Sequence, residues 1–155
     1  MKQYYNITKT LKDTLEAHDQ VNVVTEGDIF DVDLNKQTIF PLSQIQVNQA
    51  TMQGQTIIIN VSVLAMDVVD ESKDNPRSEN EPFFGIDNEQ DVLNTQLQVL
   101  NDVVSRMQRG NLMQDKYAVQ GAPVCTPFTE RFENKIAGWN CTMDIVVPNT
   151  EISVC

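Results

Sequence analysis

The sequence predicts an α+β fold in which two helices pack on one antiparallel sheet. Two segments, at about 2–17 and 88–109, repeat apolar side chains at three- and four-residue steps, the period of a helix that faces a core. The other regular segments alternate apolar and polar side chains, the period of a strand. The strands fall into two groups divided by the second helix. The expected order is therefore α-β-β-β-α-β-β, which is typical of the α+β class.

The two helices are predicted from their apolar stripes. The stripe of the first helix consists of Tyr4, Ile7, Thr8, Leu11 and Leu15. The stripe of the second consists of Leu93, Gln96, Leu97, Leu100, Val103, Val104 and Met107. Of these, Leu97 and Leu100 are assigned to the core. The second helix also has acidic residues in its first turn and arginines in its last turn, with Gly110 after it, and these signals suit the helix dipole at both ends.

The clearest strand runs over residues 55–69. One of its faces is apolar and includes Ile59 and Val61, which we assign to the core, whereas the other face is mixed. Its predicted partner is the alternating segment 42–51. Gly54 lies between the two segments and suits a tight turn, so they are expected to form a long antiparallel hairpin.

The last third of the chain returns to the strand period. Its final two strands are predicted to form a hairpin that closes near residue 134. Trp139 begins the buried face of the second of these strands and is assigned to the core. Gly138 before it either admits a close backbone or leaves room for the indole. Shorter strands are expected at "KYAVQG" and in the β-branched run from Val21.

The 155 residues suit a single domain, 1–155, with a continuous core. The segment at about 70–90 is polar, acidic and interrupted by Pro and Gly, which predicts a long loop. Phe83 and Phe84 in its middle either pin the loop to the core or contact a partner. Residues 149–155 are expected to form a loose, extended tail or to add to a neighbouring molecule.

The charge excludes several classes of partner. With 22 acidic and 11 basic residues, the chain carries a formal charge of −11, and its few cations are too diluted to form a binding face. Such a chain does not grip a phosphate backbone or an anionic membrane surface. We find no apolar run of membrane-spanning length and no signal-peptide pattern, so we expect a protein made in a cytoplasm.

Residues that carry catalysis or bind metals are scarce. The single histidine, His18, ends the first helix, where we expect it to face solvent. The three cysteines lack zinc-site spacing. Cys125 and Cys141 could meet across a hairpin, but reduced thiols are expected. Acidic clusters at 28–33 and 70–74 need no metal in so acidic a chain. Without a nucleotide-binding or hydrolase motif, we predict a non-enzymatic protein with no cofactor and no metal.

The order of elements and the segment "ERFENKIAGWNCTMDIVVP", residues 130–148, resemble a known group of phage proteins. The chain is similar to tail-completion or tail-terminator proteins of tailed bacteriophages, and in particular to small neck or ring proteins of crAss-like phages. The likeness covers nearly the whole chain. Its motif-like part is the "RF", "N", "AGW" and alternating strand of the quoted segment.

The resemblance implies a structural protein of the virion neck or tail, assembled in the host cytoplasm. Subunits would form a six-fold or twelve-fold ring against other neck, portal or tail proteins. Ring closure requires two different patches per subunit, and the candidates are the Phe83-Phe84 loop, the hairpin tip at Gln53-Gly54 and the C-terminal tail. An acidic lumen would let double-stranded DNA pass without binding. The alternative is a soluble adaptor that binds another protein through Phe83 and Phe84.

Overall fold

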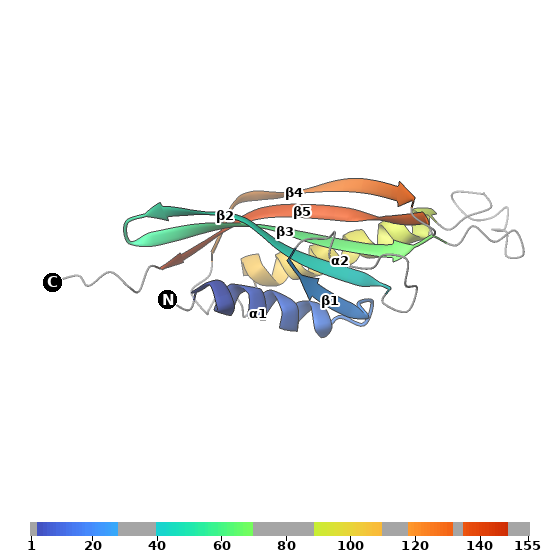
Figure 1. Cartoon of the computed structure of the whole chain (residues 1–155), viewed down its shortest axis with the longest axis horizontal. Coiled ribbons are helices and arrows are strands. Elements are labelled where there is room, and N and C mark those ends of the chain that lie inside the picture. The colour runs from blue at the N-terminus through green and yellow to red at the C-terminus, as the bar shows by residue number, and fades with distance from the viewer. Residues whose placement is uncertain (1–2, 28–39, 70–88, 110–117, 132–134, 149–155) are drawn as a thin grey trace, which may run out of the picture.

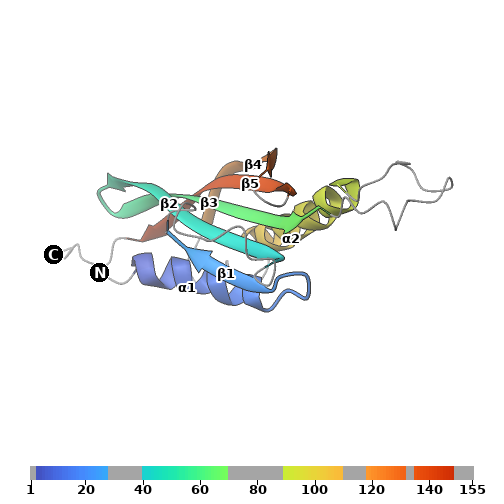
Figure 2. The same cartoon turned by 45° about the vertical axis from the view of Figure 1, so that its right-hand side comes forward.

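Five strands form one mixed sheet, and both helices cover the same face of it (Figures 1 and 2). The computed structural model describes residues 3–27, 40–69, 89–109, 118–131 and 135–148. In chain order the elements are α1 (Gln3–Glu16), β1 (Val23–Glu26), β2 (Leu42–Gln53), β3 (Thr56–Val68), α2 (Glu89–Arg109), β4 (Ala118–Arg131) and β5 (Lys135–Pro148). The α+β class predicted from the sequence is confirmed.

The sequence predicts an antiparallel sheet, but the sheet in the structure is mixed. Its spatial order is β1-β2-β3-β5-β4, so β5 lies between β3 and β4. The pairs β2–β3, β3–β5 and β5–β4 are antiparallel, but β1 pairs parallel to β2, with Val23 opposite Leu42. Parallel neighbours need a long return connection, and the chain between Glu26 and Leu42 is long enough to provide one.

The main core lies between the helices and the sheet. Because side chains alternate along a strand, β3 and β5 each present one apolar face to the helices. Ile59, Val61 and Leu100 all lie in this buried cluster. Leu97 does not: 37% of it is exposed, so its assignment to the core is wrong. A smaller cluster on the other face contains Phe40, Leu42, Met66 and Ile136.

The β2–β3 hairpin forms a long projection. Gln53 pairs with Thr56, so Gly54 and Gln55 make a two-residue turn. Gly54 has a φ of +71°, a conformation that tight hairpin turns require and that glycine adopts without steric cost. The turn lies beyond the ends of both helices in two views (Figures 1 and 2). The far end of the hairpin is therefore not covered by the helix layer.

Strand β4 is one continuous strand where the sequence analysis expected two. Its register with β5 shifts between Gln120 and Val124. Gln120 pairs with Asp144 and Val124 pairs with Thr142, so three residues of β4 lie opposite a single residue of β5. This is a β-bulge, and Gly121 within it has a φ of +71°. The "GAP" sequence that interrupted the alternation is the bulge itself.

Gly138 and Trp139 fix how β5 meets its neighbours. A Cβ atom at Gly138 would lie 2.1 Å from the carbonyl oxygen of Ala65 and 2.8 Å from the Cα of Met66. Close backbone approach is therefore the reason for this glycine. The indole of Trp139 is partly buried against the main core, and its Nε1 donates to the carbonyl oxygen of Leu93 at 2.8 Å. That hydrogen bond ties α2 to the centre of the sheet.

Asp67 lies on the helix-facing side of β3, next to the buried Ala65. Burial raises the pKa of its carboxyl, and a hydrogen bond of 2.7 Å from the backbone N–H of Val68 partly opposes the rise. The folded state thus binds this proton more readily than the unfolded chain does. The ionised carboxylate consequently destabilises the fold.

We expect Asp67→Asn to increase the free energy of unfolding at neutral pH, because the amide keeps the acceptor for Val68 and removes the buried charge. Between the ordinary pKa of 3.8 and the raised folded value, the native state holds more protons, so wild-type stability falls as the pH rises. The increase in the free energy of unfolding of Asp67→Asn over the wild type should be complete above the raised pKa of Asp67 and absent below pH 3.8. Urea unfolding at a series of pH values measures it.

The matched control is Asp19→Asn, which removes the same charge from an exposed position after α1. It corrects for the lower net negative charge. Equal gains from the two substitutions at every pH would contradict the effect of burial at Asp67.

Candidate interaction surfaces

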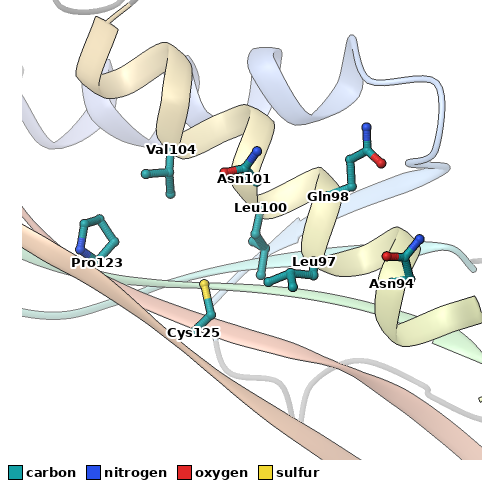
Figure 3. Close-up of a pocket in the computed structure, with 8 residues that line it drawn as sticks. All are labelled: Asn94, Leu97, Gln98, Leu100, Asn101, Val104, Pro123 and Cys125. Atoms are coloured by element: carbon teal, nitrogen blue, oxygen red, sulfur yellow. The ribbon is translucent and has the colours of Figure 1, made fainter. Parts of the chain in front are cut away.

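A groove opens between α2 and β4 (Figure 3). It has a volume of about 420 Å³. Its polar lining residues are Asn94, Gln98 and Asn101, all from α2, and its other lining residues are Leu97, Leu100, Val104, Pro123 and Cys125. An apolar floor beside a few amide groups is a common composition for a binding cleft.

Leu97 is exposed because it borders the groove between α2 and β4. The groove is also lined by Pro123 from the bulge of β4, across from α2. Leu97 therefore meets the open groove instead of a packed strand. The sequence period placed it correctly on the inward stripe of α2, but it could not reveal the groove.

Two cysteines meet directly beside this groove. Cys125 of β4 stands opposite Cys141 of β5 in the strand register, and both are free thiols. Cys141 is fully buried, whereas Cys125 is partly exposed and lines the groove. Burial raises the pKa of Cys141 to about 12, with further contributions from its hydrogen bond and charge interaction with Cys125. The structure thus brings together the two cysteines, a meeting across a hairpin that the sequence left open.

His18 connects the two helices. The prediction that it faces solvent is therefore wrong. Its Nε2 lies 2.7 Å from Oδ2 of Asp102 on α2, and its Nδ1 accepts from the backbone N–H of Gln20 at 3.1 Å. Because Nδ1 accepts, the proton resides on Nε2 and is donated to the carboxylate. The residue is half-buried. Its role in the described structure is to hold the end of α1 against α2.

Glu89 anchors the beginning of α2 to the β4–β5 hairpin. Its Oε2 lies 3.2 Å from Nζ of Lys135, and its Oε1 accepts from Oγ1 of Thr129 at 3.0 Å. Both interactions cross from the first turn of the helix to neighbouring strands. A carboxylate in the first turn also suits the helix dipole. The acidic start signal of α2 therefore also makes a tertiary contact.

The face of the sheet that carries no described helix bears a ladder of polar side chains. Asn48 Nδ2 donates to Oδ1 of Asn60 and to Oγ of Ser62, both at 2.8 Å. Asn60 Nδ2 donates to Oδ1 of Asp144 at 2.7 Å, and Ser62 Oγ lies 3.2 Å from Oγ1 of Thr142. The ladder crosses β2, β3 and β5. It gives this face hydrogen-bonding groups with little charge.

The tip of the β2–β3 hairpin is exposed over residues 48–55. It includes Gln53 and Gly54, which the sequence analysis proposed as interface residues. It also exposes 67% of Met52, whose register partner Ile57 is buried. Phe83 and Phe84, the other proposed interface residues, lie outside the described residues. An exposed methionine near the end of a projecting hairpin suits a protein contact.

Within the described residues, no group of His, Cys, Asp and Glu side chains is arranged to hold a metal ion. The two acidic clusters noted in the sequence, at 28–33 and 70–74, lie outside these residues, as does the predicted tail at 149–155. Among the helices described, none is long and apolar enough to cross a membrane.

Comparison with protein-family models and with curated proteins finds no match for this chain. No relative therefore assigns a role to any of the surfaces above. The fold is an α+β domain with a mixed sheet of order β1-β2-β3-β5-β4 and a projecting hairpin. Its features of potential functional use are the hairpin tip, the polar sheet face and the groove with its cysteine pair.

Proposed function

We propose that this chain is a non-enzymatic structural subunit of a tailed bacteriophage, which forms an oligomeric ring in the neck or tail. The proposal starts from the resemblance of residues 130–148, which supply the end of β4, all of β5 and the connection between them. Portal, neck or tail proteins are its partners, and the virion is its location. The chain's own surfaces support a role in assembly, as follows.

The projecting hairpin is the observation that carries this proposal. A ring closes through heterologous contacts, which need two different patches on each subunit. The hairpin tip, with Met52, Gln53 and Gln55, provides one patch beyond the helix layer. The polar ladder around Asn60 provides a second, chemically different surface on the open face of the sheet. A tip that reaches past its own domain is placed to contact the next subunit.

The acidic composition supports passage of DNA through such a ring. Carboxylates along a lumen repel the phosphate backbone, so double-stranded DNA moves through without specific binding. Much of the acid excess lies in residues 28–39 and 70–88, outside the described part of the chain. An assembled ring with a basic lumen would contradict the proposed passage of DNA, but it would not contradict the proposal that the chain forms a ring.

The test is the Met52→Asp variant, examined by mass photometry and negative-stain imaging, alone and after co-expression with portal and tail proteins. Wild-type protein should give rings in at least the co-expressed sample, whereas Met52→Asp should remain monomeric because it places a charge in an apolar contact. Loss of a central anchor of about 2 kcal/mol weakens a contact roughly thirtyfold, and a closed ring repeats that loss at every interface.

Tyr5→Asp is the matched control. Tyr5 on α1 is 72% exposed, so this variant also replaces an exposed apolar side chain with a carboxylate but leaves the hairpin unchanged. It should assemble like the wild type. Wild-type protein that stays monomeric under both conditions would overturn the ring proposal. Normal rings from Met52→Asp would remove the hairpin tip from the interface.

A further inference from the structure

The two cysteines of the β4–β5 hairpin are placed for a covalent bond. Cys125 faces Cys141 directly, and the flanking pairs Val124–Thr142 and Thr126–Asn140 keep the same register. Residues opposite each other in antiparallel strands have Cα atoms about 4.5 to 5.5 Å apart. A disulfide spans Cα separations of about 4.4 to 6.8 Å. The strand register therefore suits the Cα separation that a disulfide requires.

Only one cysteine of the pair is accessible from solvent. Cys141 has no exposed surface, while Cys125 lines the groove between α2 and β4 and directs its Sγ toward the helix (Figure 3). Leu97 and Val104 lie across the groove from Cys125, and Pro123 lies beside it on the strand. At about 420 Å³, the groove falls in the size range of small-molecule sites. A small reagent can thus reach Cys125 from solvent but cannot reach Cys141 directly.

We propose that Cys125 and Cys141 form a thiol–disulfide exchange site, which a low-molecular-weight disulfide such as oxidised glutathione oxidises through this groove. Cys125 loses its proton, and its sulfur attacks one sulfur of the reagent. The reagent's S–S bond breaks, a mixed disulfide forms on Cys125, and one reagent thiol leaves with a proton. Cys141 then attacks Sγ of Cys125 and its proton passes to the second reagent sulfur, which leaves as a thiol. Because burial raises the pKa of Cys141, this second step is slower than the first.

The exchange is balanced in atoms and electrons. Two protein thiols are oxidised to one disulfide, and the reagent disulfide is reduced to two thiols. Cys125 acts first because, of the two, it lines the groove, and Cys141 acts second because it is fully buried beside Cys125. The product joins edge strand β4 to β5 next to the bulge, where the ladder is interrupted. This inference does not depend on ring assembly, and its test uses the free subunit.

The experiment uses a Cys155→Ser background, so that only the paired cysteines react. After treatment of the folded protein with oxidised glutathione, intact mass should show the loss of two hydrogen atoms, and peptide mapping should join Cys125 to Cys141. The bond closes a short loop, so the melting temperature should rise by roughly 5 to 10 °C. Thiols that remain free, or a glutathione adduct that persists on Cys125, would overturn the proposal.

Two further variants in this background test the order of events. Cys141→Ser should stop at a stable glutathione adduct on Cys125, whereas Cys125→Ser should leave Cys141 unmodified in the folded protein. An adduct on Cys141 in the second variant would contradict attack through the groove. If either serine variant fails to fold, the result in the Cys155→Ser protein still decides whether the disulfide forms.

The path through the groove is tested separately with Asn101→Trp, which places an indole over the opening from α2. Its reaction with oxidised glutathione should be slower by about tenfold, because exchange rates depend on access to the attacked sulfur. Arg106→Trp is the control, since Arg106 is exposed on the same helix and does not line the groove. Equal rates in both variants would exclude the groove as the path.

Discussion

Gly138→Ala is expected to destabilise the protein by about 3 kcal/mol or more, because no side chain fits between β5 and β3 at this position. The added Cβ would meet backbone atoms, namely the carbonyl oxygen of Ala65 at 2.1 Å and the Cα of Met66 at 2.8 Å. Backbone atoms in the centre of a sheet cannot move aside as the end of a flexible side chain can. Urea unfolding, followed by the fluorescence of the neighbouring Trp139, measures the loss.

Gly54→Ala is the control that separates close approach from backbone conformation. Gly54 has a positive φ, but a Cβ there would meet nothing within 4 Å. Its substitution should cost only about 1 kcal/mol, which is the strain of a left-handed alanine. Equal losses at the two glycines would show that the contact between β3 and β5 is looser than the structure indicates.

Leu100→Ala is expected to reduce the free energy of unfolding by about 3 kcal/mol, whereas Leu97→Ala should cost about 1 kcal/mol or less. Both leucines lie on α2, and the two substitutions remove the same atoms. Leu100 is fully buried in the main core, so its truncation leaves a cavity. Leu97 borders the groove and is 37% exposed, so solvent already reaches the space that its truncation would open.

Denaturant unfolding of the two variants under identical conditions checks this difference. Since helix propensity changes equally at the two positions, the comparison isolates burial. A larger loss at Leu97 than at Leu100 would mean that the groove is closed in solution and that Leu97 belongs to the core after all.

The elements with strong local signals were predictable from the sequence. Helix α2 was expected at 88–109 and occupies Glu89–Arg109, because its stripe and both of its ends agree. The β2–β3 hairpin was likewise expected, since period two on both strands and a glycine between them leave few alternatives. The apolar faces that carry Ile59 and Val61 followed from the same alternation.

What the sequence did not reveal depends on contacts between distant segments. A strand period fixes which side chains share a face, but it does not fix the neighbour, so the parallel pairing of β1 could not be inferred. His18 looks like an exposed helix end until Asp102, from the other helix, is placed beside it. Leu97 fits the helical stripe, yet it is exposed because it borders the groove between α2 and β4.

The meeting of Cys125 and Cys141 across a hairpin was a possibility with a signal in the sequence. The β4–β5 connection is centred on residue 133, and counting outward from it pairs Cys125 with Cys141. The same count fails beyond Val124, where "GAP" inserts the bulge. The groove, in contrast, had no sequence signal, because it depends on how far α2 stands from a bent strand.

The position of β5 between β3 and β4 has a kinetic consequence. Thr56 of β3 pairs with Pro148 of β5, and the whole of α2 and β4 lies between them in the chain. The β2–β3 and β4–β5 hairpins close locally and are quick to form, but joining them requires the closure of a long loop. We therefore expect the pairing of β3 with β5 to be the slow step of folding, with α2 already helical when the two halves of the sheet meet.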